Sequence, residues 1–496
     1  MNTLLLEFSV VALGVLLLLV DAFSDRTNKN YISYFGALGL AGVLALSFLP
    51  QINPLANGPT AAFISIDPGS TFFVRFLLIA TIIVVLMTPS FVPVLERYVP
   101  AERKGGGVAE FAILPIFSCA GLMWMVRSVD FIMIFVALEL ATITLYILVT
   151  YLRQNQSSLE AGTKYLILGA LSTGFLVYGI SWIFGVTGTT NLALLPQAIG
   201  SLPSSAMLPL LFGIALIFVA LSFKIAAFPF QFWVPDVYQG APTAMTLLVG
   251  GGPKLAAFSW GLRFLVVGLL PLAVDWQQML VILAALSLIV GNITGIVQKN
   301  VKRMLAYSAI ANMGFVLLGL LSGVIDGKAL GAADAYGSAT FYGITYLLTT
   351  LGTFGIVMLI SRRDFEADNI DDLKGLMKRS PVFGLVMTLF MFSLAGIPPL
   401  VGFYAKLSVL TATMNAGLTW LTVLAVITSL FGAFYYLRIV KLMWFDEPVD
   451  TSPLETTLCA QAFMLLNGLA IIALGIFPGA LMTLCQHALQ LSFFKL

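Results

Sequence analysis

Apolar stretches of about 20 residues recur from one end of the chain to the other, the length that spans the hydrocarbon core of a bilayer. Short polar connections separate them, so each stretch predicts one membrane-spanning helix. The pattern predicts fourteen spans: 4–23, 32–50, 72–94, 109–127, 130–150, 158–186, 206–235, 241–268, 276–297, 302–323, 338–360, 381–412, 418–441 and 457–484. The connections leave no room for a soluble domain, and we expect an all-α polytopic membrane protein.

Two of these spans are long, carry a lysine and are interrupted by proline. The seventh contains Lys224 and then Pro229, and the twelfth contains Pro398-Pro399 followed by Lys406. Proline removes a backbone donor and breaks a helix, and broken backbone survives in lipid only where it is buried in protein or lines a cavity. The two spans are five apart, an odd number, so a five-helix unit repeated at this distance is inverted in the membrane. Paired broken helices favour a transporter-type site.

The composition agrees with a membrane protein. Hydrophobic residues make up 59% of the 496 positions and charged residues 10%, with a mean hydropathy of +1.00, whereas a soluble domain is about 25% charged. Of the lysines and arginines in the connections, sixteen fall on one side of the membrane and five on the other. The richer side is expected to be cytoplasmic, so both termini are predicted to be extracytoplasmic. Span 4–23 lacks a basic leading segment and a cleavage site, so we expect it to be a retained helix.

Metal and redox centres are not expected in this chain. Cys119, Cys459 and Cys485 are scattered without a CxxC motif, and the only histidine is His487. Zinc, haem and iron–sulfur sites need several such ligands at suitable spacing.

The four basic residues outside the connections, Lys164, Lys224, Lys254 and Lys406, all lie within spans. A lysine at this depth costs a few kcal/mol and normally faces a protein interior or a water-filled cavity. Burial favours the neutral form of lysine, which lets such a residue exchange protons. The alternative is a structural cation held by carbonyl groups freed at the helix breaks. Because the lysines accompany the breaks, we favour proton exchange.

Glu139 lies in the middle of an apolar span, and Lys164 lies in the next span. At 1.5 Å per residue they stand about 16 Å and about 10 Å from the inner ends of their helices, so a lysine side chain can cover most of the difference. We predict an ion pair whose carboxylate acts as a proton switch. The alternatives are a pair that only locks two helices, or a Lys164 that extends to the inner surface. Ordinary helix-end charges are predicted for Asp21, Asp130, Asp236 and Arg263.

Four long motifs stand out: FKIAAFPFQFWVPDVYQGAPT, PKLAAF, VQKNVKRMLAYSAIANMGFVLLG and AGIPPLVGFYAKLSVL. They resemble the antiporter-like membrane subunits of respiratory complex I, also called NADH-quinone oxidoreductase. LVDAF at 19–23, ALEL at 137–140 and PDVYQGAPT at 235–243 are most similar to subunit N of the bacterial enzyme, whose mitochondrial counterpart is NADH dehydrogenase subunit 2. The resemblance extends from the first span to about residue 445.

The resemblance implies two inverted five-helix repeats, helices 4–8 and 9–13, with a hydrated polar axis at mid-membrane. It makes Glu139 the carboxylate of an ion pair with Lys164, places Lys224 in broken helix 7 and Lys254 in helix 8, and puts Lys406 on the exit side of the proton route. The implied segments are 1–108 (three helices), 109–270 and 271–445 (the repeats) and 446–496 (a helix and tail).

The chain departs from the family pattern at two positions. Gln231 and Asn312 stand where the family often has histidine. Both keep the polarity, but neither side chain can carry a proton as imidazolium does. A relay in this chain therefore has to use lysines, carboxylates and water.

The resemblance implies a proton-translocating subunit of a redox-driven pump in a bacterial inner membrane. FMN, iron–sulfur clusters and quinone are expected in partner subunits, and this chain alone is expected to perform no redox catalysis. Its expected neighbours are other membrane subunits, including antiporter-like ones. Two alternatives remain open: a cation/proton antiporter subunit of an Mrp-type or hydrogenase-type complex without NADH, and a scaffold that has lost transport. Five buried ionisable residues argue against the scaffold, because they are costly without a task.

Overall fold

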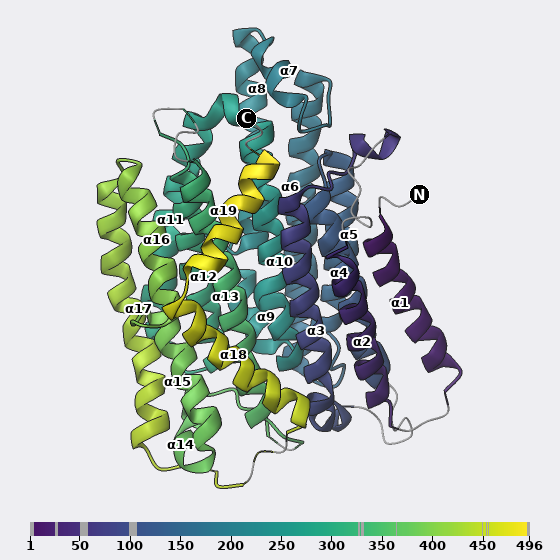
Figure 1. The fold of residues 1–496 in the computed structure, drawn as a ribbon, viewed down its shortest axis with the longest axis vertical. Coiled ribbons are helices and arrows are strands. Elements are labelled where there is room, and N and C mark those ends of the chain that lie inside the picture. The colour runs from purple at the N-terminus through teal and green to yellow at the C-terminus, as the bar shows by residue number, and fades with distance from the viewer. Residues whose placement is uncertain are drawn as a thin grey trace.

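The computed structural model describes residues 4–24, 28–49, 58–98, 107–325, 328, 332–363, 365–448, 450–452, 454 and 456–493. These residues are almost entirely helical, and most helices run along the longest axis of the molecule (Figure 1). The helices of the first half are α1 (Leu5–Ala22), α2 (Asn30–Leu46), α3 (Pro68–Arg97), α4 (Val108–Arg127), α5 (Phe131–Val149), α6 (Gln156–Thr187), α7 (Leu195–Gly200), α8 (Ser204–Ile225), α9 (Trp233–Gly240) and α10 (Thr243–Arg263). Those of the second half are α11 (Ala273–Ile296), α12 (Val301–Leu321), α13 (Ala332–Ile360), α14 (Leu376–Arg379), α15 (Pro381–Ala395), α16 (Val401–Asn415), α17 (Thr419–Phe445), α18 (Leu458–Ile476) and α19 (Gly479–Phe493).

Eleven helices in the described part of the chain are long and apolar enough to cross a membrane. The other three predicted spans correspond to α2, which has 17 residues, to α10, and to the broken pair α15 and α16. In the middle of α10, the run from Gly250 to Lys254 supplies glycine, proline and a charge in place of apolar side chains. The predicted all-α polytopic membrane fold is confirmed.

Both predicted helix breaks are present. Helix α8 is followed by Ala226, which has a positive φ of 68°, and α15 is followed by Gly396, with a φ of 85°. The left-handed conformation stops each helix, and a short irregular stretch containing Pro229 or Pro398-Pro399 leads to α9 or α16. The seventh and twelfth spans therefore each consist of two helices separated by a short non-helical stretch.

The separation of five spans that relates the two helix breaks also relates other features of the two halves. Asp130 caps α5 and Asn300 caps α12, and in each case the side chain accepts hydrogen bonds from the first turn. Each cap also pairs through its backbone with the connection after the following helix, Asp130 with Asn191 and Asn300 with Asn369. Five crossings separate these caps, so the two pairings lie at opposite ends of the molecule. This arrangement is that of an inverted repeat; the residue boundaries of the four segments stay predictions.

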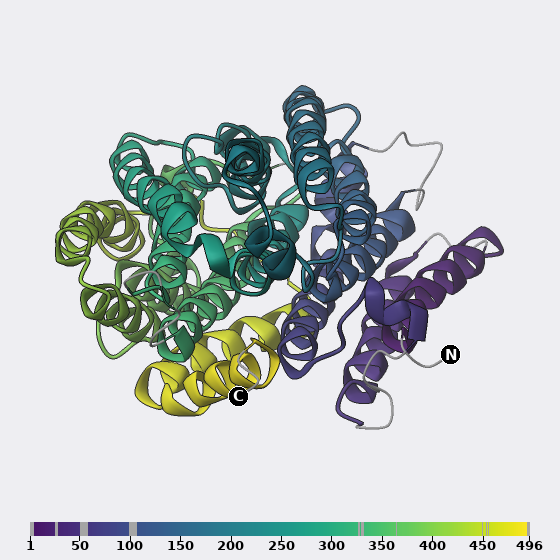
Figure 2. The same cartoon turned by 90° about the horizontal axis from the view of Figure 1, so that it is seen from above.

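The prediction of one continuous span at 457–484 is wrong, because the chain breaks near Pro478 between α18 and α19. Helix α18 packs against α3, α13, α15 and α16, and α19 packs against α3 and α13. Gly69 N donates a hydrogen bond of 2.7 Å to Ser492 Oγ. Helices α18 and α19, drawn in yellow, cross one side of the bundle (Figures 1 and 2), so they connect the N-terminal helices to the second repeat.

Two buried ion pairs also hold the N-terminal helices. Glu7 of α1 binds Arg127 at the end of α4 with a separation of 2.6 Å, and both side chains are fully buried. Asp67, which caps α3, binds Arg263 at the end of α10, also at 2.6 Å. Burial alone raises the pKa of Asp67, but Arg263 and hydrogen bonds from Ser70 and Ser65 outweigh it and hold that pKa below its usual value. The prediction that Arg263 is an ordinary helix-end charge is therefore wrong.

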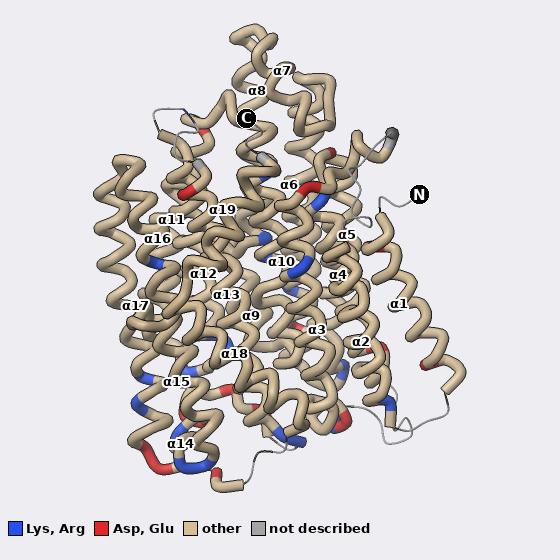
Figure 3. Tube along the Cα trace, in the orientation of Figure 1, with Lys and Arg blue, Asp and Glu red and all other residues tan. Residues whose placement is uncertain are grey.

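Charged residues gather at the end of the molecule that carries α14 (Figure 3). That end holds the connections predicted to be cytoplasmic, including 361–380. Four of the counted basic residues, Arg26, Arg103, Lys104 and Lys495, lie outside the described residues. The chain ends themselves also lie outside them, so the orientation of the termini stays a prediction.

Candidate functional site

Lys254 is fully buried in α10 and faces tyrosines from two other helices. Its Nζ donates a 2.7 Å hydrogen bond to Tyr238 Oη of α9, and Tyr238 Oη in turn donates to the carbonyl oxygen of Gly250 at 3.3 Å. The ammonium also lies 5.0 Å from the Tyr238 ring centre and 5.8 Å from that of Tyr346 on α13. Lys254 therefore has neutral, polarisable partners in place of a carboxylate, an environment in which it can lose its proton without leaving an unpaired anion.

Lys406 lies at the second helix break. Its Nζ donates hydrogen bonds to the last two carbonyl oxygens of α15, those of Leu394 at 2.9 Å and Ala395 at 3.0 Å, and to Ser429 Oγ of α17 at 3.1 Å. These carbonyl groups have no intrahelical donor because α15 ends there. The break thus builds the site that holds the lysine.

A small polar cavity lies between the two lysines. It has a volume of about 20 Å³, enough for one water molecule. Its lining includes Tyr346, which also faces Lys254, and Leu394, whose carbonyl group binds Lys406. The remaining lining residues are Asn312, Tyr342, Thr345, Thr349, Ser393, Gly402 and Ala405. The cavity therefore places polar side chains and space for one water molecule between a ring that faces Lys254 and a carbonyl group that binds Lys406.

Asn312 is the centre of the hydrogen bonds beside this cavity. Tyr342 Oη donates to Asn312 Oδ1 at 2.7 Å, and Asn312 Nδ2 donates to the Ser308 carbonyl oxygen at 2.7 Å and to Tyr436 Oη at 3.4 Å. Ser308 and Tyr436 are also hydrogen-bonded to each other. The amide thus orders a tyrosine on each side, a positioning role that needs no imidazolium.

Lys224 differs from the other two lysines. It is buried at the end of α8, and among the described residues its Nζ has no hydrogen-bond partner; the ring of Phe223 lies 5.7 Å away. The alternative of a structural cation held by carbonyl groups freed at the break is not what the structure has at Lys224. The carbonyl oxygen of Phe223 accepts from Trp233 Nε1 at 2.8 Å, and that of Ser222 accepts from Ala227 N, so backbone and indole donors have taken these acceptors.

Glu139 and Lys164 do not form the predicted ion pair. Glu139 accepts a 2.8 Å hydrogen bond from Thr173 Oγ1 of α6 and lies within electrostatic reach of Lys224. Lys164 extends away from it and binds Glu160 at 2.7 Å and Asp236 at 2.8 Å. Two carboxylates nearer the inner end outcompete a single deeper one, because a lysine reaching toward water loses less hydration. The alternative of a Lys164 extended to the inner surface is what the structure has.

Asp236, predicted to be an ordinary helix-end charge, joins several elements. One carboxylate oxygen binds Lys164 and the other binds Arg303 of α12 at 2.6 Å. Asp236 and Arg303 face a hollow of about 230 Å³ that Glu160, Glu366 and Asp368 also line. Burial raises the pKa of Glu366, an effect that Lys302 opposes. Lys302 is itself buried and binds Asp368 at 2.8 Å. This charge-lined hollow lies at the C-terminal end of α9.

Sequence reasoning singled out Asn312 but not the tyrosines that lie beside the lysines. Tyr238 lies in α9, Asn312 in α12, and Tyr342 and Tyr346 in α13, and only the packing of these three helices brings the four residues together. Their one visible mark is a polar atom within an apolar span. Within the described residues, histidine, cysteine, aspartate and glutamate form no group of three or more that could hold a metal ion.

Residues 128–432 match a family model described as NADH:quinone oxidoreductase/Mrp antiporter, TM. A relative from Paraburkholderia phymatum, NADH-quinone oxidoreductase subunit N, is 54% identical and covers 99% of this chain and 98% of its own length. The chain belongs to the NADH-quinone oxidoreductase subunit N family.

Solved structures agree with membership in the subunit N family. A chain of respiratory complex I from Thermus thermophilus superposes with a TM-score of 0.79 at 30% identity, covering 96% of this chain and 98% of that one. A chain of the Mrp complex from Dietzia has a TM-score of 0.81 at 19% identity, with coverage of 100% and 98%. At that identity the Mrp likeness concerns the fold alone. The motif resemblance to subunit N is confirmed.

Proposed function

We propose that this chain is the proton-translocating membrane subunit of a redox-driven NADH:quinone oxidoreductase in a bacterial inner membrane. Glu139, Lys164, Lys224, Lys254 and Lys406 are the proposed proton-handling residues. The observation that carries the proposal is the small polar cavity whose lining includes Tyr346, which faces Lys254, and Leu394, whose carbonyl group binds Lys406. A transport route through an apolar bundle needs polar groups and space for water, and these residues supply both between the two lysines.

The three lysines can pass a proton because none is fixed by a carboxylate in hydrogen-bond contact. Lys224, without a hydrogen-bond partner among the described residues, has the highest cost for a charge, and the nearby Glu139 carboxylate favours its charged form. Lys254 takes the proton next, stabilised by Tyr238. Lys406 receives it through the water-sized cavity, because the carbonyl groups of α15 favour its charged form.

Helix α9 connects the charge-lined hollow around Asp236 to the lysine row, which consists of Lys224, Lys254 and Lys406. It carries Asp236, which binds Lys164 and Arg303, and two residues later Tyr238, which binds Lys254. A move of Lys164 from Asp236 to Glu139 would both neutralise the field of Glu139 on Lys224 and release α9. We therefore assign Lys164 an exchange between two carboxylate positions in place of one permanent pair.

Electron transfer belongs to other chains in this proposal. FMN, iron–sulfur clusters and quinone are assigned to partner subunits, and this chain contributes proton movement alone. Its proposed partners are the other membrane subunits of the complex, antiporter-like ones among them. Both termini are assigned to the extracytoplasmic side.

Glu139→Gln tests the function directly. Glutamine keeps the shape and can still accept from Thr173, but it cannot change charge, so we expect an assembled complex whose proton translocation per electron is largely lost. The matched control is Glu110→Gln, an exposed carboxylate in the first turn of α4, which should leave translocation unchanged. A reconstituted Glu139→Gln complex that pumps at the normal ratio would show that the switch is elsewhere.

The same preparation separates the proposal from a stand-alone antiporter. Purified in mild detergent, the chain should bring down subunits that oxidise NADH and reduce quinone. Proton movement that instead follows a sodium gradient, with no such subunits present, would favour the Mrp-type alternative.

A further inference from the structure

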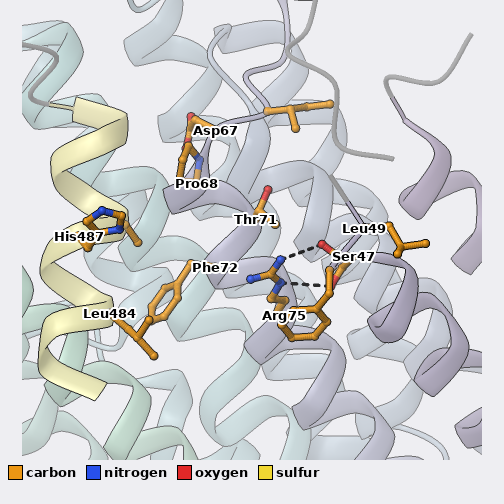
Figure 4. A pocket seen from close by; sticks show the side chains of 12 residues that line it. Ser47, Leu49, Asp67, Pro68, Thr71, Phe72, Arg75, Leu484 and His487 are labelled. Carbon is orange, nitrogen blue, oxygen red and sulfur yellow. Dashed lines mark hydrogen bonds between the residues drawn. The ribbon is translucent and has the colours of Figure 1, made fainter. Parts of the chain in front are cut away.

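A pocket of about 460 Å³ lies between the end of α2, the start of α3 and the C-terminal helix α19, away from the lysine row (Figure 4). Its walls are largely apolar, and its floor carries Arg75 and Thr71 of α3. No step of proton translocation uses these residues.

Arg75 presents unused hydrogen-bond donors to this pocket. Its Nε donates to Ser47 Oγ at 3.2 Å and its Nη2 donates to the Ser47 carbonyl oxygen at 2.8 Å. The guanidinium lies 4.0 Å from the ring centre of Phe48. Among the described residues Nη1 has no hydrogen-bond partner, and in Figure 4 it points toward Phe72. One edge of the guanidinium is thus fixed and the other is open.

The charge in the pocket is not balanced by its own residues. Asp67 also lines the pocket, but its carboxylate is bound by Arg263 at 2.6 Å and by the backbone of Ser70. Arg75 therefore remains as the one uncompensated permanent charge among the described lining residues.

Arg75 lies at a depth along α3 where it can reach a lipid headgroup. It lies seven residues into α3, about 10 Å from the start of that helix, close to where α2 ends. At such depth an arginine reaches for the interface, and phosphate matches its planar donors. The mouth of the pocket exposes Phe48, Leu49 and Leu484, large apolar side chains suited to acyl chains and not to a free anion.

We propose that this pocket binds an anionic phospholipid, with the phosphate on Arg75 and Thr71 and an acyl chain against Phe72 and Leu484. The phospholipid contacts α2, α3 and α19, so it reinforces the packing of the C-terminal helix α19 against the N-terminal helices. The proposal does not depend on the transport function.

Photo-crosslinking tests it on the protein purified with its native partners in mild detergent and placed in nanodiscs. The probes are phosphatidylglycerol and phosphatidylethanolamine with the same photoreactive acyl chain. We expect phosphatidylglycerol to label the peptide around Leu484, and Arg75→Gln to reduce that labelling about tenfold, the loss of one charge-assisted contact. Arg438→Gln is the matched control: this arginine of α17 donates to the Gln298 carbonyl oxygen and should leave the labelling unchanged.

Because Arg75→Gln also removes the bonds to Ser47, Leu484→Trp provides a second variant. It narrows the mouth without touching the contacts of Arg75, and should reduce labelling as well. Equal labelling by phosphatidylethanolamine, displacement by excess inorganic phosphate, or labelling unaffected by either variant would overturn the proposal. Crosslinking of a partner subunit at Leu484 would instead identify the occupant as protein.

Discussion

The three lysines of the polar row have three different environments. Lys406 is held by carbonyl groups, Lys254 by a tyrosine hydroxyl, and Lys224 by no hydrogen-bonding group among the described residues. The cost of a positive charge therefore differs from one to the next. On the proposed route a proton would meet sites of unequal affinity, which gives each lysine a separate experimental signature.

Lys224 should tolerate no permanent charge. We expect Lys224→Ala to lower proton translocation and coupled electron transfer together, because a blocked step in a tightly coupled machine holds back the rest. Lys224→Arg should be nearly as damaging, since guanidinium does not deprotonate and the site offers it no acceptor. Quinone reduction and proton uptake by reconstituted variants measure both effects. Near-normal pumping by Lys224→Arg would make this residue a structural cation.

Asp236 should matter more than Glu160 although both bind Lys164. Asp236 is 28% exposed and shares its charge between Lys164 and Arg303, whereas Glu160 is 61% exposed. Exposed pairs contribute about 0–1 kcal/mol, and a charge-assisted bond about 1.5–3 kcal/mol. We expect Asp236→Asn to slow proton translocation about tenfold and Glu160→Gln to leave it nearly unchanged. Proton uptake per electron is the measurement, and similar effects of the two variants would remove Asp236 from the coupling scheme.

At the scale of single elements, the sequence predicted the helices and both functional breaks, because hydropathy and proline act locally. Pro478 carried the same kind of signal, but apolar residues continue across it and hid the division into α18 and α19. The partners of the lysines could not be predicted. Tyr238 meets Lys254 only because α9 folds back beside α10, and Lys164 selects Asp236 because α6 packs on α9. Sequence locates the ionisable groups; packing decides which of them touch.

Exchanging glycine and alanine should have opposite effects at the two helix breaks: Gly396→Ala should destabilise the protein, and Ala226→Gly should not. Gly396 has a φ of 85°, and an added Cβ would lie 3.0 Å from Lys406 Cδ, so Gly396→Ala adds both backbone strain, about 1–2 kcal/mol, and pressure on the lysine. Ala226 already bears such strain at a φ of 68°, so Ala226→Gly should be neutral or stabilising. The temperature at which the purified complex loses coupled activity is the readout. If both variants lowered this temperature equally, Ala226 would not bear the backbone strain expected from its φ, and the two breaks would not be equivalent.

At the scale of the whole molecule, the N-terminal helices are joined to the repeats by polar contacts as well as packing. Glu7–Arg127 joins α1 to α4, Asp67–Arg263 joins α3 to α10, and α19 reaches α3. None of these contacts involves the lysine row. The described ends of α1 and α19 that lead to the two termini both lie away from the α14 end, where charges gather (Figures 1 and 3).

This arrangement, together with the bias of sixteen basic connection residues to five, predicts that both termini face the extracytoplasmic side. Cysteine labelling of whole cells with a membrane-impermeant maleimide measures it. Cys119 and Cys485 are buried, so only exposed Cys459 has to be replaced by serine before single cysteines are introduced. Thr3→Cys and Lys495→Cys should react in intact cells. Arg363→Cys, at an exposed position in the charged connection after α13, should react only after the cells are opened. Protection of either terminus in intact cells would mean that the number of crossings is odd or that the whole orientation is reversed, and the behaviour of Arg363→Cys would distinguish these two errors.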